Sequence, residues 1–187
     1  GNSSHINSMK KVNISFYVRD GRVALAQMKR GPRAGCINGY GGKMEPQDTN
    51  IYETAQREDG QEGRISVHVD DLKPIAHITF KFGDVPRFEA FAFLIREWKG
   101  THAETDEMGP PVWYPLLQLP LDSMWPGDRL WVPEALSSGR PIEGFINYSG
   151  DGNTVLEYDF KEVSSAYLHE LAFAAKPDDA PKAAMQA

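Results

Sequence analysis

Apolar and polar side chains alternate over residues 12–18, and Val23, Leu25 and Gln27 continue the same period over residues 23–27. A period of two residues is typical of β-strands with one buried face. Asp20 and Gly21 separate the two runs, and an Asp-Gly pair between alternating segments is the strongest short-range signal for a hairpin. We therefore expect a β-hairpin near the start of the chain.

Four later segments carry strand patterns as well. Residues 72–82 and 88–98 are predicted to form two long strands that pair after a turn around Pro86, and Ile78, Phe80 and Phe82 share one face of the first. Residues 142–147 and 154–160 are predicted to form a last hairpin across the turn sequence SGDGN.

A helix is predicted over residues 50–62. One of its faces carries three residues at helical spacing, Ile51, Ala55 and Glu58. Thr49 or Asn50 can cap its first turn. Gly60 inside the helix costs roughly 1 kcal/mol relative to alanine, and Gly63 is expected to end it.

The rest of the chain adds a short helix over residues 122–129 and an amphipathic helix over residues 164–175. Strands and helices are interleaved without strict alternation, which predicts an α/β fold with a mixed β-sheet sandwiched between α-helices. We expect one domain over residues 9–175. Residues 1–8 have no apolar pattern and are interpreted as a tag or a disordered N-terminus. Residues 176–187 also lack a core-forming pattern, and a disordered C-terminal tail is expected.

Composition narrows the class of protein. The chain has 187 residues, of which 41% are hydrophobic and 25% charged, as in ordinary globular domains. Its net charge of −6 argues against a partner that is a nucleic-acid polymer. Cys36 is the single cysteine, so an internal disulfide is excluded. The longest apolar run, AFAFLI, is far below the roughly 20 residues that span a bilayer. No signal peptide is recognised, so we expect a cytoplasmic protein without a membrane partner.

The candidate chemistry is concentrated in one helix and the glycine-rich loop before it. Glu58 and Glu62 are four residues apart, so a helix places both carboxylates on one face. Such a pair is most often a solvated face without a ligand. The neighbouring Arg57 and the loop sequence GYGGK favour a site for a hard cation such as Mg²⁺, whose other partner is usually a phosphate.

Basic residues lie on a second loop beside the same glycines. Lys29, Arg30 and Arg33 form either a solvated basic tip or a site of attraction for a polyphosphate. Lys29 is the better candidate for the second role because it ends a predicted strand.

The helix and its loop resemble a Nudix box, whose pattern is G-x5-E-x7-R-E-U-x-E-E-x-G-U with U a bulky apolar residue. The positions that fall on this pattern are Gly42, Arg57, Glu58, Glu62 and Ile65. The departures are Asp48 for a glutamate with one extra residue after it, Asp59 for the apolar residue, Gln61 for a glutamate, and Arg64 for glycine.

A longer resemblance runs in order from about residue 11 to about residue 163. Residues 28–43, 105–108 and 122–131 are similar to landmarks of the mammalian-type oxidised purine nucleoside triphosphatases, the 8-oxo-dGTP diphosphatases related to bacterial MutT. This resemblance implies a Nudix fold and a Mg²⁺-dependent hydrolase, with Mn²⁺ as a possible substitute. The implied reaction converts a nucleoside triphosphate to a monophosphate and pyrophosphate.

The resemblance also implies roles for individual residues. The expected metal ligands are the Gly41 carbonyl, Glu58, Glu62 and Glu107, with Glu107 alternatively a general base. Arg57 is expected to hold a glutamate by a charge-assisted hydrogen bond. Gln61 brings no negative charge to the metal, so reduced activity is expected.

The base of the nucleotide is expected to meet Asn38, Asp128 and a stacking Trp125. Gly127 replaces the first of two adjacent aspartates in the branch, and Ile37 replaces an aromatic residue, so the preferred base stays open. The remaining candidate pocket residues are apolar and equally consistent with core packing, namely Phe80, Phe82 and Met108.

Two rival functions remain from the sequence. One is a Nudix pyrophosphatase that acts on another nucleotide, since the pocket residues are altered. The other is a catalytically impaired Nudix-fold module that binds a nucleotide without turnover. In each case the expected partner is a small nucleotide, and a monomer is expected. No dinucleotide fingerprint, Walker A motif or G-x-S-x-G elbow is present in the sequence.

Overall fold

A computed structural model describes residues 9–177, so the expectations for residues 1–8 and for most of the tail, residues 178–187, lie outside the described part. The centre of the molecule is an eight-stranded sheet in which β6 pairs with β2, and the other strands follow the order β3-β2-β1-β5-β4-β7-β8. Its strands are β1 Lys10–Arg19, β2 Arg22–Gln27, β3 Ile37–Asn38, β4 Lys73–Phe82, β5 Val85–Ile95, β6 Val112–Pro115, β7 Ile142–Tyr148 and β8 Val155–Glu162. The pairs β1–β5 and β4–β7 are parallel and the others antiparallel, which confirms the mixed sheet.

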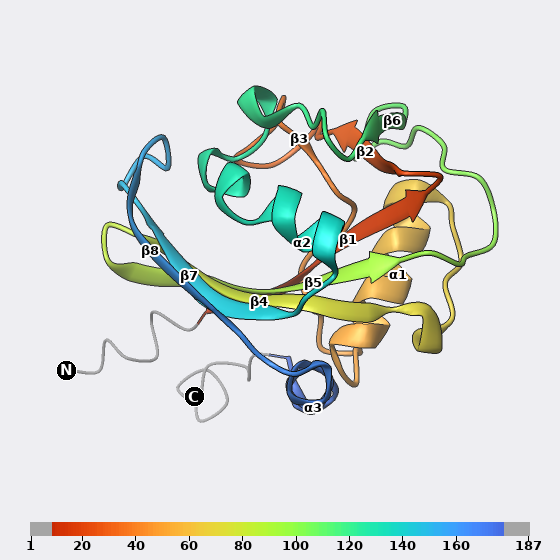
Figure 1. Cartoon of the computed structure of the whole chain (residues 1–187). Coiled ribbons are helices and arrows are strands. Elements are labelled where there is room, and N and C mark those ends of the chain that lie inside the picture. The colour runs from red at the N-terminus through yellow and green to blue at the C-terminus, as the bar shows by residue number, and fades with distance from the viewer. Residues whose placement is uncertain (1–8, 178–187) are drawn as a thin grey trace, which may run out of the picture.

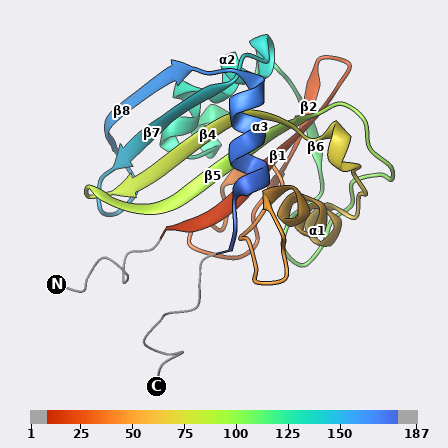
Figure 2. The ribbon, with the colours of Figure 1, turned by 90° about the horizontal axis from the view of Figure 1, so that it is seen from below.

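Helices cover both faces of this sheet (Figure 1). The α-helices are α1 Ile51–Gly63, α2 Val132–Ser138 and α3 Ser165–Ala174, and the short 3₁₀ turns are η2 Val69–Asp71, η3 Leu121–Ser123 and η4 Pro126–Leu130. α1 and α3 lie on one face, which the view from below shows in front of the strands (Figure 2). α2 lies on the opposite face, with η3 and η4 leading into it. The predicted sandwich is confirmed.

Alternation along β1 assigns its side chains to two separate cores. Phe16 and Val18 pack into the cluster that contains α2. Tyr17, between them, packs into the cluster that contains Ile51, Tyr52 and Ala55 of α1 and Ala172 of α3. The turn between β1 and β2 is the one that the sequence predicts, because Asp20 and Gly21 have φ values of +54° and +72°. Two consecutive positive φ angles match a hairpin turn whose twist fits that of the strands.

The structure extends or shifts several predicted elements. The second long strand is Val85–Ile95, three residues earlier than expected, and the short helix is reduced to 3₁₀ turns. β3, β6 and α2 were not predicted, since each is short, with two, four and seven residues respectively. None of the helices within residues 9–177 is long and apolar enough to cross a membrane.

α1 begins at a well-formed cap. The Asn50 side chain accepts a hydrogen bond from the Glu53 N–H at 3.1 Å, and the Glu53 carboxylate accepts one from the Thr49 N–H at 2.8 Å. This reciprocal pair satisfies two donors that the first turn would otherwise leave free. The cap therefore fixes the start of the helix that carries the acidic pair.

We expect Asn50→Ala to lower the free energy of unfolding by about 1 kcal/mol, because the Glu53 N–H loses its acceptor. Urea unfolding at equilibrium measures the change. Thr49→Ala is the matched control, since the cap uses only the backbone N–H of Thr49. Equal losses in the two variants would show that the Asn50 side chain is not the capping group.

Candidate functional site

The glycine-rich loop after β3 is pinned to β1. The Ser15 N–H donates to the Tyr40 carbonyl, and the Asn13 N–H donates to the Gly42 carbonyl at 3.0 Å. A side chain at Gly41 would begin 1.9 Å from the carbonyl oxygen of Asn13, so the close approach of the two backbones requires glycine there. The loop thereby presents its backbone groups to the last turns of α1.

Glu58 and Glu62 both face this loop, as the sequence predicts. The Gly41 N–H donates to Oε1 of Glu62 at 2.7 Å. Glu58 lies so close to Gly42 that a Cβ on that glycine would stand 1.4 Å from its Oε2. The acidic pair therefore lies against the loop and not on a solvated face.

The electrostatic state of the pair follows from burial and from mutual repulsion. Burial raises the pKa of Glu62 to about 9, and the charges of Glu58 and Glu107 act in the same direction. Burial also raises the pKa of Glu58, against the opposing effect of Arg57. Carboxyl groups with raised pKa values beside one another form a site that a cation would stabilise.

Arg57, in the middle of α1, binds Asp48 before the helix and Glu58 beside it. Its guanidinium donates from Nε and Nη2 to the two oxygens of Asp48, at 3.1 and 2.8 Å, and from Nη1 to Glu58 Oε1 at 2.7 Å. Burial disfavours the Asp48 carboxylate, but the hydrogen bonds from Arg57 and others outweigh it and lower its pKa. Asp48 thus pairs with the arginine from the position where the Nudix pattern has a glutamate, despite the extra residue that follows it.

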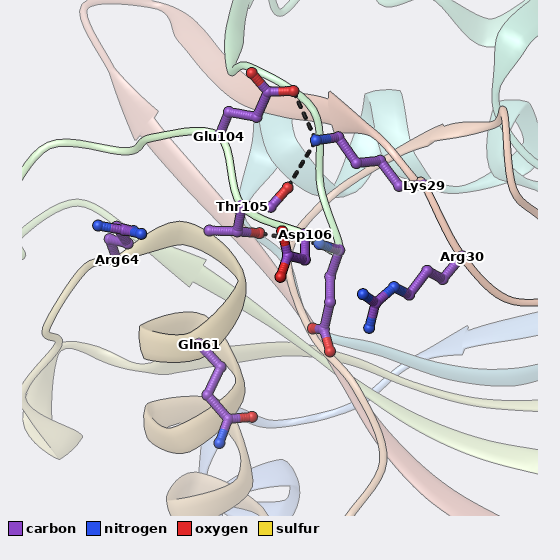
Figure 3. Close-up of a pocket in the computed structure, with 8 residues that line it drawn as sticks. Lys29, Arg30, Gln61, Arg64, Glu104, Thr105 and Asp106 are labelled. Atoms are coloured by element: carbon purple, nitrogen blue, oxygen red, sulfur yellow. Dashed lines mark hydrogen bonds and ion pairs between the residues drawn. The ribbon is translucent and has the colours of Figure 1, made fainter.

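Glu107 lies on the loop across the cleft from α1. The Thr105 hydroxyl donates to the Glu62 carbonyl at 2.9 Å, and the Lys29 N–H donates to the Glu107 carbonyl at 2.9 Å. Lys29 Nζ reaches Glu104 at 2.6 Å and the Thr105 carbonyl at 2.8 Å (Figure 3). Lys29 therefore holds the loop through Glu104 and Thr105, and its role at a phosphate stays a prediction.

A cleft of about 530 Å³ separates these two sides of the site. Its lining is polar and includes both charges, from Lys29, Arg30, Gln61, Arg64, Glu104, Thr105, Asp106 and Glu107. Gln61 points into it from α1 (Figure 3). Within residues 9–177, no three His, Cys, Asp or Glu side chains are close enough to form a ready metal site. The donors nonetheless suit a hard cation, because Glu58, Glu62 and Glu107 are oxygen donors whose charges lie close enough to act on one another.

Phe80, Phe82 and Trp125, among the other predicted substrate residues, pack on the α2 side of the sheet. Trp125 contacts Phe80 and Phe82 with ring centroids 6.4 and 6.0 Å apart. Asp128 is buried beside them in η4, and burial raises its pKa to about 7. The Asn38 side chain accepts a hydrogen bond from the Gly39 N–H at 2.8 Å.

Met108 does not join this aromatic group. It is 2% exposed and packs in the opposite core cluster with Tyr17 and Tyr40. Its placement favours the core-packing interpretation that the sequence left open.

Two side chains at the aromatic group were not singled out from the sequence as base contacts. The Arg33 guanidinium lies over the Trp125 ring, 4.0 Å from its centroid, and also donates to the Gly152 carbonyl. Tyr148 packs against Trp125 at 5.5 Å. The sequence offers Arg33 as part of a solvated basic tip or of a polyphosphate site, and no local pattern signals Tyr148, because its partners are distant in sequence.

Asp59 departs from the Nudix pattern, and the structure gives it a role. It is fully buried and accepts hydrogen bonds from the Tyr17 hydroxyl at 2.5 Å and from Asn13 Nδ2 at 3.3 Å. Asn13 in turn accepts from the Gly42 N–H at 3.0 Å. A polar network therefore links α1, β1 and the glycine loop beneath the acidic pair.

Comparison with known proteins agrees with this geometry. A family model described as the NUDIX domain matches residues 9–135. The chain belongs to the Nudix hydrolase family. The chain is 37% identical over 145 residues to a protein of Mus musculus named oxidized purine nucleoside triphosphate hydrolase, covering 77% of this chain and 89% of that protein. A protein of Danio rerio with the same name is 34% identical over 155 residues, covering 82% and 96% respectively.

Solved structures of other proteins share the fold. The mutator MutT protein from Bacillus halodurans superposes with a TM-score of 0.69 at 26% identity, covering 82% of this chain and 98% of that one. The Escherichia coli ORF135 protein superposes with a TM-score of 0.56 at 22% identity, covering 72% and 94%. The Nudix fold expected from the resemblance is therefore confirmed. Nudix hydrolases generally use a divalent metal ion, and the acidic pair on α1 offers ligands of the type that such an ion prefers.

We expect Asp59→Asn to reduce the pH dependence of stability. Burial raises the pKa of Asp59 from 3.8 to about 7, so its contribution is fully present below pH 4 and is lost as the pH rises to about 7. Asparagine cannot ionise. The urea midpoint of the Asp59→Asn variant should therefore fall less between pH 4 and 8 than that of the unaltered protein. Parallel pH curves would contradict the assignment.

Asp59→Leu is the contrasting variant. Leucine leaves the Tyr17 hydroxyl and Asn13 Nδ2 without the acceptor that Asp59 provides, at a cost of about 1 to 3 kcal/mol for each buried group.

Proposed function

We propose that this Nudix protein hydrolyses nucleoside triphosphates with Mg²⁺, releasing pyrophosphate and a nucleoside monophosphate, and that oxidised purine nucleotides are among its substrates. The observation that carries the proposal is the contact of Glu58 and Glu62 with the Gly41–Gly42 turn, beside a polar cleft. The aromatic group around Trp125 supplies the apolar surface that a base needs. Relatives named for oxidised purine nucleotides support the choice of substrate.

The residues proposed to hold the metal are Glu58, Glu62, Glu107 and the Gly41 carbonyl. The ion would neutralise phosphate charge and polarise the bond to be broken. Arg57 orients Glu58, and the Gly41 N–H orients Glu62, so both carboxylates are positioned before a ligand arrives. Glu107 is proposed to accept the proton of the attacking water if it is not a ligand.

The substrate is proposed to bind in two regions, with its phosphates in the cleft and its base at the aromatic group. Arg30 and Arg64 line the cleft and can attract the phosphates, while Lys29 is held by Glu104. Trp125, with Asn38 and Asp128, is proposed to bind the base. A cytoplasmic location and a monomeric state also belong to this proposal, and size-exclusion chromatography with light scattering tests the latter.

A nucleotide panel is the direct test. Pyrophosphate release is measured for 8-oxo-dGTP, dGTP, dATP and ADP-ribose, each with Mg²⁺ and with chelator. Mg²⁺-dependent release from triphosphates supports the proposal. Turnover confined to ADP-ribose would favour a pyrophosphatase for another nucleotide, and binding without any product would favour a non-catalytic module.

We expect Glu62→Gln to lower kcat by about 10²-fold or more, because a ligand charge is lost where the reacting phosphate develops charge. Thermal stability at pH 7 should not fall, since burial already disfavours the charged form of Glu62 and glutamine can still accept from the Gly41 N–H. Glu53→Gln, on an exposed position of the same helix, is the matched control and should keep its activity. Unchanged turnover in Glu62→Gln would remove the metal assignment.

We expect Gln61→Glu to raise kcat/KM by roughly tenfold, equivalent to about 1.4 kcal/mol in the barrier. The physical reason is that the exposed Gln61 lines the cleft, where a further carboxylate would strengthen metal binding. Steady-state kinetics at several Mg²⁺ concentrations measures the effect, and Gln118→Glu is a control with the same charge change on an exposed turn. An absence of gain would show that the missing carboxylate does not limit the rate.

A further inference from the structure

Tyr148 places a hydroxyl group in the space beside Gly127. The Gly127 N–H donates to the Tyr148 hydroxyl at 3.1 Å. A Cβ added to Gly127 would lie 2.5 Å from that oxygen and 2.9 Å from Cδ1 of Ile146. An aspartate at position 127 and a hydroxyl at position 148 therefore compete for one volume. The chain has glycine at the first position and tyrosine at the second.

The hydroxyl retains a proton to donate. It accepts from Gly127, and among residues 9–177 it has no hydrogen-bond acceptor of its own. Burial raises the pKa of Tyr148, and the negative charge of Asp128 acts in the same direction, so the phenol stays protonated at any physiological pH. Tyr148 is thus a fixed donor.

An acceptor lies near this donor. Asp128 is 5% exposed in η4, directly after Gly127, and its charge is close enough to affect Tyr148. When ionised, its carboxylate can only accept hydrogen bonds. A donor and an acceptor are therefore offered together at the edge of the aromatic group.

The surroundings of this pair suit a flat ring. Tyr148 packs against Phe82 with ring centroids 5.4 Å apart and an interplanar angle of 18°, and against Trp125 at 5.5 Å. Arg33 covers the Trp125 ring, and its positive charge acts on both Asp128 and Tyr148. Tyr148 is fully buried, so a ligand reaches it only when side chains around it move, and Arg33, on the partly exposed loop between β2 and β3, is the one that covers Trp125.

We propose that Tyr148 is a specificity-determining residue that donates a hydrogen bond to a ring carbonyl of a purine, while Asp128 accepts from the adjacent ring N–H. The inference rests on the proposed function and names the part of the substrate that this pair recognises. The matching ligands are oxopurines, in which a carbonyl stands next to an N–H. A site built to bond such groups leaves its own polar atoms unpaired with analogues that lack them.

Equilibrium binding of monophosphates tests the inference without turnover. Isothermal titration of the full chain with dGMP, 8-oxo-dGMP, dAMP and 2-aminopurine deoxyriboside monophosphate compares bases with and without the carbonyl. We expect Tyr148→Phe to weaken both oxopurine nucleotides about tenfold, as expected for one lost hydrogen bond, and to leave the other two within about twofold. Tyr158→Phe, an exposed tyrosine on β8, is the matched control.

The outcomes separate this inference from the proposed function. A uniform change for all four ligands, or none, would overturn the role of Tyr148 while triphosphate hydrolysis by the unaltered protein still stood. If the unaltered protein bound none of these ligands and hydrolysed no triphosphate, both would fall.

A double-mutant cycle tests the shared volume. Gly127→Asp alone should lower the melting temperature, because its Cβ meets the Tyr148 hydroxyl. Gly127→Asp combined with Tyr148→Phe should recover part of that loss and restore a preference for oxopurine over 2-aminopurine nucleotides. Strict additivity of the two changes in both measurements would contradict the exchange of one polar group for the other.

Discussion

The site depends on a buried carboxyl group that fastens a helix to a strand. Asp59 projects from α1 into the sheet, where Tyr17 and Asn13 of β1 satisfy its oxygens. Asn13 extends the connection to the backbone of Gly42. Because unpaired polar groups at this depth would be costly, only one register of the helix on the strand satisfies them all. That register turns Glu58 and Glu62 toward the glycine loop.

Charge is concentrated where the helix, the loop and the far side of the cleft meet. Burial and repulsion raise the pKa values of Glu58 and Glu62, and such an arrangement is stabilised by a bound cation or a proton. Arg57 offsets part of this repulsion from one side only, through Asp48 and Glu58. The loop that carries Glu107 is fixed independently by Thr105 and Lys29. The fold thus holds the carboxylates of Glu58, Glu62 and Glu107 near one another, and the contacts that fix the loop do not involve the Glu107 carboxylate.

The sequence was sufficient for the elements whose signals are local. The Asp20-Gly21 turn, the cap at Asn50 and the alternation along the long strands each depend on residues close in the chain, and each was placed within a few residues. β3 and β6 were not predicted because they have only two and four residues, too few for a recognisable pattern. Their pairing with β2 is decided by tertiary contacts. The spacing of Glu58 and Glu62 predicted a common face, and the neighbouring GYGGK sequence indicated the loop that this face meets.

Long-range pairs could not be predicted from one sequence. Asp59 and Tyr17 are 42 positions apart, and Gly127 and Tyr148 are 21 apart. Each substitution looks like damage when compared with the family pattern alone. Only the three-dimensional arrangement shows which residues lie against each substitution. The Tyr148 hydroxyl lies beside Gly127, and Tyr17 and Asn13 of β1 bind Asp59.

The position of Arg33 has a consequence for molecules that compete for the aromatic surface. The guanidinium already occupies one face of the Trp125 indole, a contact generally worth about 0.5 to 2 kcal/mol. An incoming flat ring must repay that amount before any gain from stacking is realised. Free bases and metabolites without phosphates have little binding energy with which to displace Arg33. A ligand whose phosphates bind elsewhere in the cleft has enough. Arg33 therefore disfavours the binding of weak, unspecific ligands to the Trp125 ring.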